Sequence, residues 1–446
     1  MRLNKQKKGE GGFIKGAMWI AGGGFLAKVI GALYRIPLTN LIGGKGLGLY
    51  QLVYPIYCLL LTVSATGIPS SIAKLTAERV AKGEETESLF KTARRLFLWI
   101  GIAGTCLMAI IAPYLARIQN TEGVLYGYYA LAPSVALTSA ISVYRGWFQG
   151  QNNMLPTAFS EVLEQLVKVG IGLIFAYLFR ENVERAVVFL LLAVSISELA
   201  TLFLMMYFRA RVSRKKTKKE GGRVAMKSIL QLSIPITLGS ILLPLSGLLD
   251  SVLVPKLLSK YASDAITLFG LFSGGAVTIV NLPVSVCYGI AVASVPRIAS
   301  AVEKEGAGVR RRIFSALGLT ALVGAGSAVG LCLFAEPATK IVFHSLSGEE
   351  QAILISLVKS FSISAFTLSC TQTLSACLTA QGKPRYSALS MAVAMVVKTI
   401  LYLFWIPSPT ISIFGLAYAT NIAYALAFLL NLLYNLYVSK KRRKSK

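Results

Sequence analysis

Apolar runs of twenty or more residues recur along the whole chain, and short stretches with charged residues, glycine or proline separate them. Each run is long enough to cross about 30 Å of hydrocarbon as an α-helix. A membrane barrel would show shorter segments of alternating hydrophobicity, which the sequence lacks. The pattern predicts an all-α, polytopic membrane protein with twelve spans, near residues 13–37, 48–72, 94–116, 124–147, 157–179, 186–208, 229–254, 266–295, 313–335, 352–379, 386–406 and 411–437.

Composition and charge support a membrane location and give an orientation. The chain is 55% hydrophobic and 15% charged, whereas soluble domains average about 25% charged residues. Most of the 46 Lys and Arg residues gather in alternate connections and in both terminal segments. By the positive-inside rule these segments face the cytoplasm, so we expect a multi-pass protein of the bacterial inner membrane with both termini cytoplasmic. The net charge of +27 then reflects contact with anionic membrane lipids rather than with nucleic acid.

The two halves of the chain resemble each other. Residues 157–168 align without gaps on residues 387–398, and a Gln-Gly pair precedes each stretch. Six spans per half preserve orientation, so the halves are expected to form pseudo-symmetric six-helix lobes around a central cavity, as in many transporters. The predicted divisions are an N-terminal lobe, 1–208, a basic cytoplasmic linker, 209–228, a C-terminal lobe, 229–438, and a basic cytoplasmic tail, 439–446.

Ionisable residues occur inside the predicted spans, where each costs about 2.5–3.5 kcal/mol and needs a partner or a wet cavity. They are Lys28, Arg35, Lys168, Lys359, Lys398, Glu161, Glu164, Glu198 and Asp250. Glu164 and Lys168 share one helix face. An internal ion pair between them and a direct substrate or proton role both stay open. Glu198 and Asp250 are further candidates for ion coupling or ion pairing.

Lys398 is the counterpart of Lys168 in the second half, but Ala394 stands where the first half has Glu164. Because Lys398 has no carboxylate on its own helix, a substrate-binding role is favoured for it. The first span offers two further cations, Lys28 and Arg35, seven residues apart on one side of a helix. They favour an anionic group such as a diphosphate, although Arg35 could instead reach outward to the lipid headgroups.

Polar residues near prolines extend this candidate substrate-binding set. The second span opens with Tyr50, Gln51, Tyr54 and Pro55, and the eighth contains Asn281 two residues before a proline. Prolines at these positions indicate bent or broken helices, as expected where a cavity is lined.

No motif for covalent or nucleotide chemistry stands out. The sequence has no P-loop, and Gly43-Gly-Lys-Gly46 lacks the required hydroxyl residue. The six cysteines show no paired spacing, and the single histidine, His344, lies in a short polar connection. We therefore expect no enzyme activity, no catalytic residue, no cofactor and no metal site.

Several stretches resemble the stage V sporulation protein B group. They are Gly31-Ala-Leu-Tyr-Arg-Ile-Pro-Leu-Thr39, Gly46-Leu-Gly-Leu-Tyr-Gln51, Tyr54-Pro55, Gly67-Ile-Pro-Ser-Ser-Ile-Ala-Lys74 and Glu164-Gln-Leu-Val-Lys168. This group of polysaccharide biosynthesis flippases belongs to the multidrug/oligosaccharidyl-lipid/polysaccharide (MOP) exporter superfamily, together with the lipid II flippase MurJ. The resemblance implies a V of two lobes with a cationic cavity, in which Lys28, Arg35 and Lys168 match the family's basic positions. Many members have fourteen helices, whereas twelve are predicted here.

The resemblance also implies a function. A flippase of this group moves a polyprenyl-diphosphate-linked saccharide, such as lipid II or a related envelope precursor, to the outer leaflet by alternating access, for cell wall synthesis in growth or in sporulation. The expected partners are this glycolipid, anionic membrane lipids and envelope-synthesis proteins. The alternatives are a cation or drug exporter of the same superfamily, coupled to Na⁺ or H⁺, and a scaffold that transports nothing.

Overall fold

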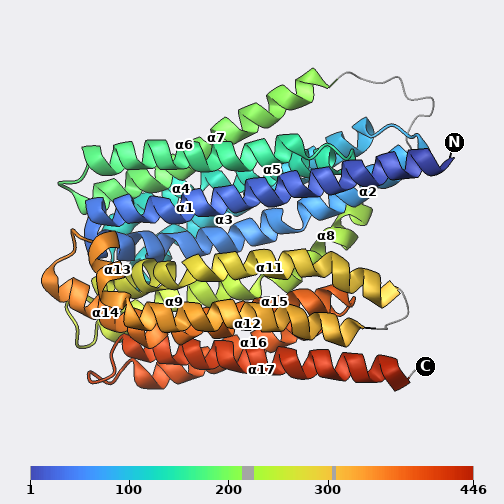
Figure 1. The fold of residues 1–446 in the computed structure, drawn as a ribbon. Helices are drawn as coiled ribbons and strands as arrows, with labels where there is room; N and C mark the ends of the chain where they lie inside the picture. The colour runs from blue at the N-terminus through green and yellow to red at the C-terminus, as the bar shows by residue number, and fades with distance from the viewer. Residues whose placement is uncertain (1, 213–225, 304–307, 445–446) are drawn as a thin grey trace. The chain divides into compact units, whose positions relative to one another are not determined.

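The chain is helical along almost its entire described length. The computed structural model describes residues 2–212, 226–303 and 308–444, and no β-strand occurs among them. Figure 1 shows long helices that lie side by side within each half of the chain. The prediction of an all-α, polytopic membrane protein is confirmed.

Every predicted span falls mostly on helical residues. By length and composition, eight of the described helical segments can cross a membrane, or nine if a pair bent by 45° at Ser362 forms one span. Three features account for the difference from twelve. Residues 22–82 count as one continuous segment, the helix over residues 155–178 carries three ionisable residues, and the seventh predicted span is divided into two short helices. The predicted number of twelve is consistent with the structure and is not fixed by it.

Two compact units make up the chain. Unit 1 comprises Met1–Leu38 and Leu52–Leu248, and unit 2 comprises Thr39–Gln51 and Leu249–Lys446. Most of the predicted linker, 209–228, lies outside the described residues, so the predicted lobe boundaries stay a prediction. The two units differ from the predicted lobes in one respect: residues Thr39–Gln51, which lie in the first helix, belong to unit 2.

The helices of unit 1 follow a simple order along the chain. Residues 2–38 and 52–61 of α1 (Arg2–Leu61) belong to this unit. The other elements are η1 (Thr62–Thr66), α2 (Ile68–Lys82), α3 (Glu87–Ile118), η2 (Glu122–Val124), α4 (Leu125–Leu131), α5 (Pro133–Gly150), α6 (Leu155–Leu178), α7 (Val183–Arg211) and α8 (Met226–Ser240). Helix α5 packs against α2, α3 and α7, and α6 packs along α7 (Figure 1).

Unit 2 is also a bundle of helices that follow one another along the chain. Helix α9 (Leu242–Leu258) passes from unit 1 into unit 2 between Leu248 and Leu249. The elements that follow are α10 (Ala265–Gly270), η3 (Leu271–Ala276), α11 (Val277–Glu303), α12 (Val309–Leu333), α13 (Ala335–Val342), α14 (Gly348–Phe361), α15 (Ile363–Ala380), α16 (Pro384–Trp405) and α17 (Phe414–Lys444). Helix α15 packs against α11, α12 and α17, and α16 packs along α17.

Breaks in the helices occur at Gly43 and around Gly67, whereas α1 continues through Pro55 and α11 continues through Pro283, where the sequence predicted bends. Helix α1 kinks at Gly43, whose φ of 66° lies in the left-handed region that glycine adopts most readily. The π-helical element η1 ends at Gly67, and α2 begins immediately afterwards with Pro69 in its first turn. A second π-helical element, η3, precedes Asn281. π-Helical turns of this kind frequently occur at functional sites.

A very close helix contact holds residues 39–51 within unit 2. A Cβ atom at Gly48 would lie 2.1 Å from the carbonyl oxygen of Ile266, and one at Gly270 would lie 2.3 Å from the backbone nitrogen of Gly48. Only glycine permits backbones to approach so closely, as in the small-residue contacts of membrane helices.

We expect Gly48→Ala to lower the free energy of unfolding by about 1–3 kcal/mol, because the new methyl group would overlap backbone atoms of α10. Thermal unfolding of the purified protein in detergent measures the change. Gly289→Ala in α11 is the control, since a Cβ there meets no atom within 4 Å. Equal melting temperatures for the two variants would contradict the close contact.

Candidate functional site

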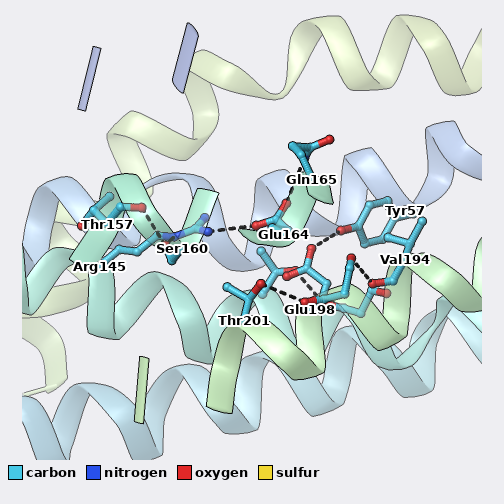
Figure 2. A network of polar contacts seen from close by, with 12 residues as sticks. Tyr57, Arg145, Thr157, Ser160, Glu164, Gln165, Val194, Glu198 and Thr201 are labelled. Atoms are coloured by element: carbon cyan, nitrogen blue, oxygen red, sulfur yellow. Dashed lines mark hydrogen bonds and ion pairs between the residues drawn. The ribbon is translucent and has the colours of Figure 1, made fainter. Parts of the chain in front are cut away.

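Charged and polar side chains of four helices meet inside unit 1. We call Tyr57, Arg145, Glu164, Lys168 and Glu198 the unit 1 charge cluster. Figure 2 shows all of these side chains except Lys168. They come from α1, α5, α6 and α7, and each lies within a segment predicted to cross the membrane. Charges in such a segment need partners or a wet cavity, so the contacts of this cluster decide what it can bind.

Arg145 and Glu164 form the central ion pair of the cluster. The Nη2 atom of Arg145 lies 2.9 Å from Oε2 of Glu164, and its Nε donates a hydrogen bond to Oγ of Ser160, also over 2.9 Å. The amide nitrogen of Gln165 donates to the second oxygen of Glu164 over 3.4 Å. Figure 2 shows the carboxylate of Glu164 between these donors. Both of its oxygens are therefore engaged.

Arg145 was not among the site residues predicted from the sequence. A signal was present, since Arg145 lies within the limits of the predicted span 124–147. The side chain is only 14% exposed in the structure.

Glu198 is a buried carboxylate with few donors. Its Oε1 accepts a hydrogen bond from the Tyr57 hydroxyl over 3.2 Å, and its Oε2 is buried without a hydrogen bond among the described residues. The neighbouring hydroxyls on α7 point elsewhere, because Ser197 and Thr201 donate to carbonyl oxygens of their own helix. Glu198 thus has spare acceptor capacity inside the protein.

Lys168 lies half-buried on α6 and forms no ion pair within 4.0 Å among the residues that the structure describes. The ion pair with Glu164 that the sequence left open is not formed, because Glu164 contacts Arg145 instead. The charges of Glu164, Glu198 and Arg35 nevertheless act on the Lys168 ammonium group. Lys168 is therefore a cation in an apolar segment, and the Glu164 carboxylate on its own helix is already engaged by Arg145.

The first part of α1 packs on α6 through glycines. A Cβ at Gly23 would lie 2.9 Å from Cβ of Ala158, and one at Gly31 would lie 3.1 Å from Oε1 of Gln165. This contact brings Arg35 into the electrostatic field around Lys168. The side chain of Lys28 lies outside the described part of the chain.

Unit 2 contains a second buried ion pair. The Nζ atom of Lys398 on α16 lies 2.5 Å from Oδ2 of Asp250 on α9, and the two side chains are 5% and 18% exposed. Lys398 was predicted to bind substrate because its own helix offers no carboxylate. The structure supplies the carboxylate from another helix, so the positive charge of Lys398 is compensated within the unit.

The other residues predicted to bind substrate are divided between the two units. In unit 2, the amide of Gln51 donates to the carbonyl oxygen of Ser273 over 2.7 Å, Tyr50 is half-buried and Asn281 is exposed. In unit 1, the ring of Tyr54 packs against that of Tyr57, with centroids 5.5 Å apart. Of the predicted set, unit 1 therefore brings together Arg35, Glu164, Lys168 and Glu198, with Tyr54 beside them, and unit 2 joins Asp250 to Lys398.

We expect Lys398→Met to lower the free energy of unfolding by about 3–5 kcal/mol, because it leaves the buried Asp250 carboxylate without its partner. The double variant Asp250→Val/Lys398→Met should recover most of this loss, since a buried pair replaced by apolar side chains is often neutral. Melting temperatures in detergent compare the three proteins. A double variant no more stable than the single one would contradict the ion pair.

Comparison with known proteins places the chain among membrane transporters. A family model described as polysaccharide biosynthesis protein matches residues 13–302, more than half of the chain. The chain is 29% identical to stage V sporulation protein B of Bacillus subtilis (strain 168) over 437 residues, which cover 94% of this chain and 82% of that protein. It is 26% identical to the lipid II flippase MurJ of the same organism over 167 residues, which cover 35% and 31% of the two chains.

Solved structures show the same fold at low sequence identity. An inward-facing multidrug resistance MATE family transporter of the MOP superfamily matches with a TM-score of 0.76 and 15% identity, over 93% of this chain and 96% of that one. The lipid II flippase MurJ in an inward closed conformation matches with a TM-score of 0.72 and 15% identity, over 95% and 89%. The chain is thus a multi-pass membrane protein that belongs to the polysaccharide biosynthesis protein family and has the fold of the MOP-superfamily transporters.

Proposed function

We propose that this protein is a flippase that moves a polyprenyl-diphosphate-linked saccharide, such as lipid II or a related envelope precursor, from the inner to the outer leaflet by alternating access. The observation that carries the proposal is Lys168, a cation within a membrane-spanning segment whose neighbouring carboxylate is engaged by Arg145. The family description and the names of the two Bacillus relatives support it.

A diphosphate fits the electrostatics of unit 1. It would supply the negative charge that Lys168 lacks, and charge-assisted hydrogen bonds from an ammonium or guanidinium group are the strong contacts that phosphate oxygens prefer. Arg35 acts on the same region from α1. We include Lys28 in the site on its sequence position alone. No covalent step is needed, so the proposed role is transport rather than catalysis.

The proposal includes a location and an orientation. The positive-inside rule favours an inner-membrane protein with both termini in the cytoplasm. In this orientation, a substrate with two negative charges gains about 2.3 kcal/mol per charge per 100 mV when it moves outward. The membrane potential can then drive flipping without ATP.

An exporter of organic cations coupled to Na⁺ or H⁺ is the second candidate, and Glu198 is the observation that favours it. An exporter of that kind needs a buried carboxylate without a compensating base. Glu164 and Asp250 do not qualify, since Arg145 and Lys398 neutralise them. Glu198 does, because it accepts a hydrogen bond from the neutral hydroxyl of Tyr57 and forms no ion pair within 4.0 Å among the described residues. The exporter hypothesis therefore depends on one carboxylate.

We expect Lys168→Gln to slow lipid II flipping in proteoliposomes roughly 10- to 100-fold, the effect of losing one hydrogen bond to a charged group. Lys359→Gln is the matched control, because Lys359 is an exposed lysine of α14. Flipping that is equally fast in both variants would refute the proposed role of Lys168. If wild-type protein also exported a cationic dye faster than it flipped lipid II, the exporter would be the better assignment.

An imposed potential, negative on the cytoplasmic side, should accelerate flipping in proteoliposomes, because two charges gain roughly 4–5 kcal/mol per 100 mV. Valinomycin with a potassium gradient sets the potential, and a protease-sensitive tag reports the orientation of the protein. A rate that ignored the potential and required a Na⁺ or H⁺ gradient would show that an ion drives transport instead.

A further inference from the structure

Glu164 and Lys168 lie four residues apart on α6, a spacing at which a carboxylate and an ammonium group readily pair. The pair would be strengthened inside an apolar segment, where charges attract more strongly than in water. The structure shows the opposite arrangement. The Glu164 carboxylate is held by Arg145 and Gln165, and Lys168 makes no ion pair among the described residues.

The contacts of Arg145 explain why Glu164 pairs with Arg145 rather than with Lys168. Its guanidinium group reaches two residues one turn apart on α6, through Nε to Ser160 and through Nη2 to Glu164. The hydroxyl of Ser160 donates to the carbonyl oxygen of Thr157, so it presents a lone pair to Arg145. A planar guanidinium group can make both bonds at once, whereas an ammonium group offers one compact charge.

The second half of the chain provides an internal comparison. Lys398 occupies the register position of Lys168, and Ala394 replaces Glu164. Lys398 is nevertheless paired, because Asp250 reaches it from α9. Of the two repeat-related lysines, only Lys168 keeps its charge available for a ligand, and it does so beside a carboxylate of its own helix.

We propose that Arg145 is a positioning residue for substrate binding: it holds the Glu164 carboxylate away from Lys168 and so keeps the Lys168 ammonium group available for the diphosphate of the lipid-linked substrate. This inference rests on the proposed function. Without Arg145, the Glu164 carboxylate turns toward Lys168 and competes with the diphosphate for the same cation.

A double-mutant cycle on Arg145 and Glu164 tests the competition. Fluorescence anisotropy of labelled lipid II measures binding to the full chain in detergent. We expect Arg145→Gln to weaken binding roughly tenfold, since it creates a charged competitor in an apolar segment. The same substitution made together with Glu164→Gln should weaken binding less than twofold relative to Glu164→Gln alone, because no competing carboxylate remains. An equal loss on both backgrounds would overturn the inference.

Further variants separate positioning from folding. Melting temperatures identify variants whose weak binding reflects poor folding. Arg145→Lys keeps the positive charge but cannot contact Ser160 and Glu164 together, so we expect a smaller loss of binding than for Arg145→Gln. A loss as large as that of Arg145→Gln, in a protein with the wild-type melting temperature, would contradict the role of charge in holding Glu164.

Lys168→Gln separates the inference from the proposed function. If this variant binds lipid II as tightly as the wild type does, the proposed function is wrong, and the inference with it. If Lys168→Gln binds weakly but Arg145→Gln is equally harmful with and without Glu164, the proposed function stands and only the role of Arg145 is rejected.

Discussion

The cost of placing charge in a membrane-spanning segment governs the interior of both units. Each ionisable side chain at a helix centre costs about 2.5–3.5 kcal/mol on insertion scales, and a partner from another helix offsets that cost. Arg145 offsets it for Glu164 in unit 1, and Lys398 and Asp250 offset it for each other in unit 2. Each pair joins two different helices, α5 to α6 and α9 to α16, so charge compensation and helix packing stabilise the same structure.

The two units compensate their buried charges differently, although the two halves of the sequence resemble each other. In unit 2 the lysine of the repeat is neutralised by a carboxylate at 2.5 Å, which leaves a balanced pair. In unit 1 the related lysine lies beside an ion pair that does not include it, with the buried Glu198 carboxylate nearby. A balanced pair serves stability, whereas an unbalanced cluster can bind a charged ligand. This difference leads us to assign substrate binding to unit 1.

Much of the fold could be predicted because hydrophobic length and glycine position are local properties. The helical spans and the polar face of α6 follow from short stretches of sequence, whereas the contact of Gly23 and Gly31 with α6 is seen only in the structure. The partners of the charges could not be predicted in the same way. Asp250 and Lys398 are 148 residues apart, and only the folded chain brings them together.

Two further residues, Arg145 and Gln51, show why side-chain partners are hard to predict from a sequence. Arg145 lies near the end of the predicted span 124–147, and a charge there can lie on either side of the membrane boundary, so its contact with Glu164 was not predicted. Gln51 was predicted to bind substrate, but its amide donates to the carbonyl oxygen of Ser273, which lies in the π-helical element η3. Side-chain partners of this kind depend on the geometry of neighbouring helices.

Native mass spectrometry of the purified protein tests the central claim, that the cations of unit 1 bind the diphosphate of a lipid-linked saccharide. Lipid II, undecaprenyl phosphate and a cationic dye would compete for the wild-type protein and for Lys168→Gln. The account predicts that the wild type retains lipid II in preference to the other two and that Lys168→Gln loses this preference. Preferential retention of the dye, or equal retention of all three by both proteins, would contradict it.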